Sequence, residues 1–151
     1  MKEFRSIDDI LVFAIDEEQK AVDFYADLAK NAKSEEMSKV LVEFAGEEIK
    51  HKNRLTTIRE EGVFTMPKQQ VADLKISDYM VNIKPNPRMT YEEILVLAMN
   101  KEKAAFRLYS HLAEKSPTDE LKQVFLSLAL EESRHKLRFE LEYDEHVLRE
   151  M

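Results

Sequence analysis

The chain has 151 residues, a formal net charge of −7 and no cysteine. The lack of cysteine excludes disulfides, thiolate metal sites and iron–sulfur clusters, and the acidic balance disfavours nucleic acid as a partner. Only two glycines and four prolines interrupt the sequence, a usage typical of long helices. No apolar run is long enough to span a membrane, and the first residues lack the apolar core of a signal peptide, so we expect a soluble cytoplasmic protein.

An internal repeat organises the sequence. Shifted by 84 positions, residues 14–55 align without a gap with residues 98–139, and 14 of the 42 pairs are identical. The identical pairs include Glu18/Glu102, Tyr25/Tyr109, Glu48/Glu132 and His51/His135. Chance similarity between two amphipathic segments would not readily keep these residue types in one register, so the sequence predicts a duplicated structural unit.

Each repeat predicts a helical hairpin. In the first repeat, residues 6–62, Ser6 can cap the first helix, and Gly62 suits the C-terminus of the second. In the second repeat, residues 90–150, Thr90 begins a capping-box pattern. The connections inside the repeats are short, so the two helices of each hairpin are predicted to be antiparallel.

Residues 63–89 join the two repeats and contain three of the four prolines. The segment is long for a plain loop, and a short helix is expected over residues 71–80. It can run from one end of a helical bundle to the other, since a helix of about 27 residues is roughly 40 Å long. The sequence therefore predicts an all-α, single-domain protein over residues 1–151, in which two antiparallel hairpins form a four-helix bundle with one long crossover.

Charged residues interrupt the apolar seam of every predicted helix near its middle. They are Glu18 in the first helix, Glu48 and His51 in the second, Glu102 in the third, and Glu132 and His135 in the fourth. Glu18 and Glu48 each lie 15 residues from Lys33 in the turn, and the second repeat has the same spacing about Pro117. At 1.5 Å per residue, both carboxylates of a hairpin lie about 22 Å from its turn. The spacing predicts that four glutamates and two histidines share one layer of the core.

Four buried carboxylates repel one another and lose their hydration. Two divalent cations would neutralise them, because four carboxylates contribute −4, two neutral imidazoles contribute nothing and two cations contribute +4. The i, i+3 spacing of each Glu-x-x-His motif places both side chains on one helix face. Carboxylate and imidazole ligands suit iron or manganese, and zinc also binds them. A buried polar layer without metal is the alternative.

These motifs resemble the di-iron site of the ferritin-like superfamily and, within it, the rubrerythrin-type domain most closely. The resemblance rests on Glu18-x-x-Ala21-x-x-x-Tyr25, Glu48-x-x-His51, Glu102-x-x-Ala105-x-x-x-Tyr109 and Glu132-x-x-His135. It implies a ferritin-like fold and two iron ions as cofactors. It also implies that Glu48 and Glu132 bridge the ions, while Glu18 and Glu102 bind one ion each and the two histidines add one imidazole per ion.

Tyr25 and Tyr109 lie two helical turns from the terminal glutamates, on the same face. One interpretation is aromatic packing in the core. The other is a phenol that is hydrogen-bonded to a ligand carboxylate and can donate a proton or an electron.

The chain departs from its apparent relatives in three respects. It has no cysteine for the rubredoxin module that supplies electrons in rubrerythrins proper, and Ala105 occupies the position of their additional glutamate. The six-residue ligand set is closer to that of bacterioferritin, but Ile49 stands where bacterioferritin has a haem-ligating methionine. No fifth helix is predicted after the fourth either, so a 24-subunit storage cage is not expected.

Two adjacent ferrous ions could deliver two electrons to one molecule of O₂ or H₂O₂. We therefore predict a di-iron oxidoreductase that reduces peroxide or oxygen. Its electrons would come from a separate donor protein, since no Gly-x-Gly-x-x-Gly motif for a flavin or nicotinamide is present. The alternative is a ferroxidase-type protein that binds and sequesters iron.

Apolar residues also occur on the outer faces of the helices, away from the seams. Examples are Ile10, Val22, Phe24, Ile49, Val96, Leu97, Phe106, Leu108 and Leu137. Some of them must widen the core stripe, but exposed apolar patches usually mark contacts. We therefore predict a homodimer formed through helix-to-helix contacts.

Overall fold

The computed structural model describes residues 3–150, with side chains for residues 3–149, and the regular elements in that range are all helical. They are α1 (Ile7–Lys30), α2 (Glu35–Glu61), α3 (Lys68–Asp73), the 3₁₀-helix η1 (Ile76–Asp78), α4 (Tyr91–Glu114) and α5 (Asp119–Glu150). None of these helices is long and apolar enough to cross a membrane.

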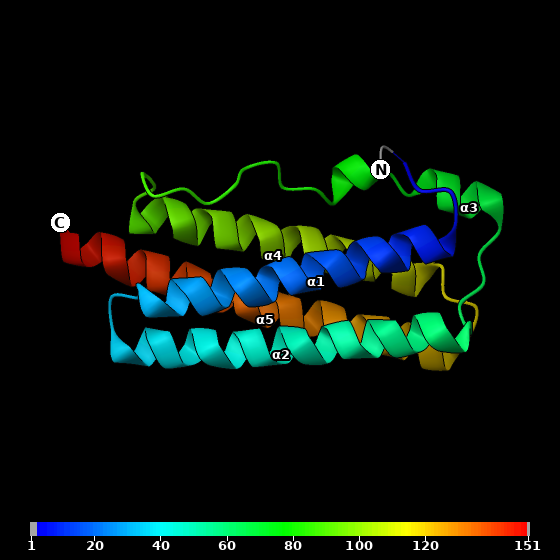
Figure 1. The fold of residues 1–151 in the computed structure, drawn as a ribbon, viewed down its shortest axis with the longest axis horizontal. Coiled ribbons are helices and arrows are strands. Elements are labelled where there is room, and N and C mark those ends of the chain that lie inside the picture. Colours follow the sequence, from blue (N-terminus) through cyan, green and yellow to red (C-terminus); the bar gives the residue numbers. More distant parts are fainter. Residues whose placement is uncertain (1–2, 151) are drawn as a thin grey trace. The chain divides into compact units, whose positions relative to one another are not determined.

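The chain divides into two compact units. Residues Phe4–Val71 contain α1 and α2, and residues 72–150 contain α4 and α5. In each unit the two long helices pack against each other and run in opposite directions, as Figure 1 shows. The prediction of an all-α chain built from two antiparallel hairpins is confirmed. The single domain over residues 1–151 stays a prediction.

Residues at the helix ends explain where the four long helices begin and where α2 stops. At the starts of α1, α2 and α5, Ser6, Ser34 and Thr118 each accept a hydrogen bond from the backbone N–H three residues later, which satisfies one of the free N–H groups of the first turn. Thr90 and Glu93 form a reciprocal capping box at the start of α4. Gly62 ends α2 in the left-handed region, with φ of 63°.

In the connection over residues 63–89, the short helix predicted over residues 71–80 is present as two shorter elements that begin three residues earlier. The connection contains α3 and η1 and then continues as an extended segment that runs along α4 (Figure 1). Residues 80–86 can span at most about 25 Å when extended, and a turn closed by the hydrogen bond from the Met89 N–H to the Asn86 carbonyl then precedes α4. The segment can thus cover most of the roughly 36 Å length of a 24-residue helix.

Tyr79 fixes the beginning of this extended segment. Its hydroxyl shares a hydrogen bond of 2.6 Å with Nδ1 of His111 near the end of α4, and the two rings meet edge to face. Burial, assisted by the negative charge of Asp78, raises the pKa of Tyr79 to about 12. The phenol therefore stays protonated at neutral pH, and the hydrogen bond is kept.

Gly46 provides a test of local stability in α2. A Cβ atom at this position would meet no atom of the described residues within 4 Å. Gly46→Ala should therefore raise the free energy of unfolding by about 0.5–1 kcal/mol, because glycine is a poor helix former. Urea denaturation measures the change. Gly62→Ala is the matched control and should lower stability, because its φ of 63° strains an L-residue. A loss of stability in the Gly46 variant would contradict the open surroundings of this site.

Candidate metal centre

The first hairpin brings together the three candidate ligands that its sequence contains. Glu18 comes from α1, and Glu48 and His51 come from α2; all three are at most 3% exposed. Nδ1 of His51 lies 3.3 Å from a carboxylate oxygen of Glu18 and 3.5 Å from one of Glu48. One ligand atom from each residue falls within 4.8 Å of the other two. We refer to these three residues as the first ligand group.

The second hairpin repeats the arrangement with Glu102 from α4 and with Glu132 and His135 from α5. All three side chains are buried. Nδ1 of His135 lies 3.7 Å from a carboxylate oxygen of Glu102 and 4.0 Å from one of Glu132. Their ligand atoms also converge within 4.8 Å. These residues form the second ligand group, and the 84-residue repeat is therefore also a repeat of geometry.

The separations within each group fit coordination of a metal ion. Nitrogen and oxygen ligands that both lie about 2.0–2.2 Å from one ion can be at most about 4.4 Å apart. The nitrogen-to-oxygen separations of 3.3–4.0 Å in the two groups satisfy that limit. Two carboxylates and one imidazole also form a donor set that iron, manganese and zinc accept. The residues present therefore fit a metal ion.

Burial also changes the protonation of the first ligand group. Desolvation, followed by repulsion from Glu48, raises the pKa of Glu18 from 4.5 to about 8, although His51 opposes the shift. In the absence of metal, the Glu18 carboxyl therefore holds a proton at neutral pH. A metal ion that binds this oxygen must displace that proton.

Tyr25 and Tyr109 are both fully enclosed, as their positions on the seams predict. Tyr25 meets Phe44 edge to face, with ring centroids 6.3 Å apart. Tyr109 stacks on Phe125 at the same centroid distance. The packing role is thus present in the structure, and the proposed role of each phenol beside a ligand carboxylate stays a prediction.

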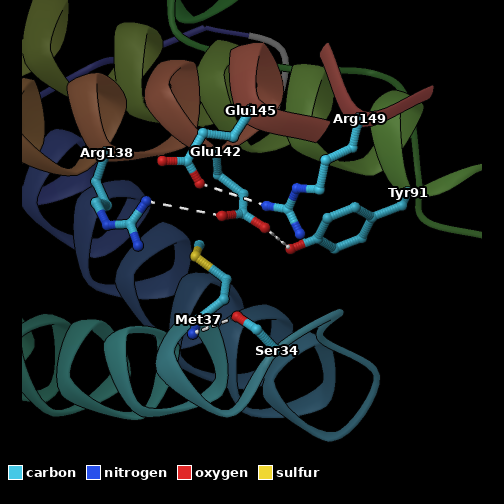
Figure 2. Close-up of polar contacts among 7 residues, drawn as sticks. All are labelled: Ser34, Met37, Tyr91, Arg138, Glu142, Glu145 and Arg149. Carbon is cyan, nitrogen blue, oxygen red and sulfur yellow. Dashed lines mark hydrogen bonds and ion pairs between the residues drawn. The ribbon is translucent and has the colours of Figure 1, made fainter. Parts of the chain in front are cut away.

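Glu142 is a buried carboxylate in the second hairpin that the sequence analysis did not identify. It accepts a hydrogen bond of 2.9 Å from the Tyr91 hydroxyl, and Arg138 lies 3.8 Å from its other oxygen (Figure 2). Glu142 lies three residues after the buried Phe139 and so continues the seam of α5, and this position in the sequence indicates that it is buried. Hydrogen bonding and charge pairing explain why a carboxylate is tolerated here without a metal.

The aligned positions of the first hairpin lack this polar pair. Ile7 corresponds to Tyr91, and Ile58 corresponds to Glu142. The two hairpins thus share their ligand groups but differ at the ends of the helices. Glu142 is therefore a feature of the second hairpin alone and is not part of the repeated ligand groups.

Paired helical hairpins with buried Glu and Glu-x-x-His groups define the ferritin-like class of carboxylate proteins. Consistent with this class, the chain resembles a crystal structure described as that of a ferritin-like diiron-carboxylate protein from Thermotoga maritima. The TM-score is 0.77 at 19% sequence identity, over 97% of this chain and 99% of that chain. The predicted ferritin-like fold is thereby confirmed.

The Rubrerythrin family model matches residues 9–87 and 93–148. The chain therefore belongs to the rubrerythrin family of ferritin-like diiron-carboxylate proteins. No curated protein shows significant similarity to the sequence.

Proposed function

We propose that the two ligand groups, one from each hairpin, together hold two iron ions. The observation that carries this proposal is the equivalence of the groups: each has two buried carboxylates and one imidazole at matching positions of the repeat. Membership of the rubrerythrin family supports the same assignment. Glu48 and Glu132 would bridge the ions, while Glu18 and Glu102 would each bind one. Manganese or zinc could occupy the same ligands.

We further propose that the protein is an oxidoreductase that reduces peroxide or oxygen with electrons from a separate donor protein. Two ferrous ions, when bound, supply at one place the two electrons that reduce one H₂O₂ to water. A separate donor is proposed because residues 1–151 contain no cysteine with which to build an electron-supplying iron–sulfur or rubredoxin-type module.

The protein side chains would set the conditions of this reaction. The carboxylates balance the charge of the ions, and their burial keeps bulk water from the ligand groups. Tyr25 and Tyr109 lie on the same helix faces as Glu18 and Glu102, where their phenols would orient a carboxylate and supply protons. Reduction of one H₂O₂ to two waters consumes two protons, so a protein source of protons is useful here.

Iron sequestration is the second candidate function. It is favoured by the plain six-residue ligand set, because Ala105 cannot supply the additional carboxylate found in rubrerythrins proper. In this case the same ligand groups would hold ferrous iron while dissolved O₂ accepts its electrons, and the ferric iron would then pass on for storage.

Addition of many equivalents of ferrous iron in air separates the two functions. An oxidoreductase should stop near two irons per chain and should consume peroxide repeatedly only when a reductant is supplied. A sequestering protein should instead accumulate a soluble mineral core without a reductant. Protein that retains no tightly bound metal after expression with iron would contradict both functions.

A further inference from the structure

An apolar stripe runs along the outer face of α5. It consists of Leu126, Leu130, Leu137, Leu141 and Leu148, and these leucines are 40–68% exposed. At 3.6 residues per turn they lie within about 60° of arc. The buried side chains of α5, among them Phe125, Leu128 and Phe139, project from the opposite face. We call the five leucines the leucine stripe.

The internal repeat shows that hairpin packing does not require this stripe. The aligned positions of α2 are Val42, Gly46, Asn53 and Thr57 in place of Leu126, Leu130, Leu137 and Leu141. Both hairpins pack their helices and hold their ligand groups, but only the second has a continuous apolar outer face. The stripe must therefore be explained by something other than the fold of the hairpin.

The spacing of the leucines is self-complementary. From Leu130 to Leu148 the separations are seven, four and seven residues, so the pattern is the same when it is read backwards. Consider two α5 helices paired antiparallel about a two-fold axis at the level of residue 139. Leu130 then faces the partner's Leu148, and Leu137 faces the partner's Leu141. In heptad notation Leu130 and Leu137 are at d positions, and Leu141 and Leu148 are at a positions. Packing of a against d between two helices is the geometry of an antiparallel coiled coil.

The charges on the same face match the same alignment. Arg134 and Asp144 occupy the two remaining positions of the seam, and both are exposed without an ion-pair partner among the described residues. In the antiparallel pair Arg134 faces the partner's Asp144, and the symmetry of the pair forms this contact twice. The flanking Arg138 and Glu140 already pair with Glu142 and Lys136 within their own helix.

We propose that α5 is a self-association surface through which two copies of the chain form an antiparallel homodimer. Six layers would form between the helices: four of leucine against leucine and two of arginine against aspartate. The seam from Leu130 to Leu148 is about 27 Å long. A face of this length covers several hundred Å² per chain, which approaches the roughly 800 Å² per partner of a standard stable interface. This inference is independent of the metal and of the proposed reaction.

Light scattering coupled to size-exclusion chromatography at micromolar concentration tests the surface. The native chain should have a mass of roughly 35 kDa, twice the 17.7 kDa of one chain. The double variant Leu137→Asn, Leu141→Thr carries the residues of the first repeat and should run as a monomer with unchanged helix content. The matched control, Val42→Asn with Ile49→Thr, alters exposed apolar residues of α2 and should remain dimeric.

A charge exchange tests the alignment itself. Arg134→Asp alone and Asp144→Arg alone should each weaken the dimer by at least about tenfold in Kd. The combination Arg134→Asp, Asp144→Arg should restore dimerisation, because the opposite charges again face each other. A native mass near 18 kDa or of several hundred kDa, a dimer insensitive to the leucine variants, or single and double charge variants of equal affinity would overturn the proposal.

Discussion

Protein expressed with iron should retain close to two metal ions per chain, and the Glu48→Ala, Glu132→Ala variant should retain neither. Each substitution removes a carboxylate that is buried beside its histidine at 3.5–4.0 Å. Residues that merely support metal ligands already contribute 10–100-fold to affinity, and removal of a ligand itself should cost more. Elemental analysis after gel filtration measures the metal content.

Glu47 and Glu131 provide a matched control for this experiment. They immediately precede the ligand glutamates in the two repeats, and both are half-buried. Their replacement by alanine removes the same two charges one residue away, so the variant should keep both ions. If the ligand variant retains two ions, or if the control loses as much metal as the ligand variant, the assignment of Glu48 and Glu132 is wrong.

The single substitutions distinguish one shared centre from two separate sites. If Glu48 and Glu132 bridge two ions, Glu48→Ala alone should weaken the binding of both ions, and Glu132→Ala alone should do the same. Two independent sites would instead leave one ion tightly bound in each single variant. The second pattern would contradict the proposed di-iron centre while leaving each ligand group intact as a metal site.

The metal-free protein should become less stable as the pH rises from about 4.5 to about 8. In the folded chain Glu18 keeps its proton up to about pH 8, whereas in the unfolded chain it loses that proton near its ordinary pKa of 4.5. Between these values the unfolded chain binds fewer protons than the folded chain, so the free energy of unfolding falls as the pH rises. Each pKa unit corresponds to about 1.4 kcal/mol, so the change should amount to a few kcal/mol.

Thermal unfolding of chelator-treated protein between pH 5 and pH 8 measures this effect. Glu18→Gln cannot ionise at this position, so its stability should depend less on pH and should exceed that of the native chain near pH 8. Added metal binds the carboxylate form, and its stabilising effect on the native chain should therefore increase as the pH rises. Identical pH profiles for the native chain and the Glu18→Gln variant would contradict the raised pKa.

The hairpins and their ligand groups could be predicted because the deciding interactions are local or periodic. Ser6 and Thr90 mark the starts of α1 and α4, because their side-chain oxygens accept hydrogen bonds from backbone N–H groups three residues later. The grouping of Glu18 with Glu48 follows from their equal distances to the turn between α1 and α2, since helical rise is constant. A charged residue on an apolar seam is costly to bury unless it is paired or binds a metal ion, so the seam glutamates predict a metal site.

The contacts that hold the connection and Glu142 could not be predicted, because their partners are distant in sequence. Tyr79 is buried through its contact with His111, 32 residues away. Glu142 is satisfied by Tyr91, 51 residues away. The position of Glu142 on the seam of α5, three residues after Phe139, indicates burial, but nothing in the local pattern identifies Tyr91 as its partner. Short-range periodicity carries no information about such pairings.

The internal repeat allows the residues that both hairpins share to be distinguished from those that only one hairpin has. Both copies contain two carboxylates and an imidazole at matching positions of the repeat, as the proposed metal binding requires. Elsewhere the copies differ: a tyrosine and a glutamate in the second stand where the first has a pair of isoleucines, and the leucine stripe occurs in the second hairpin only. A chain with two versions of one unit can thus carry an additional surface on one hairpin. The other hairpin shows which residues the ligand group needs without that surface.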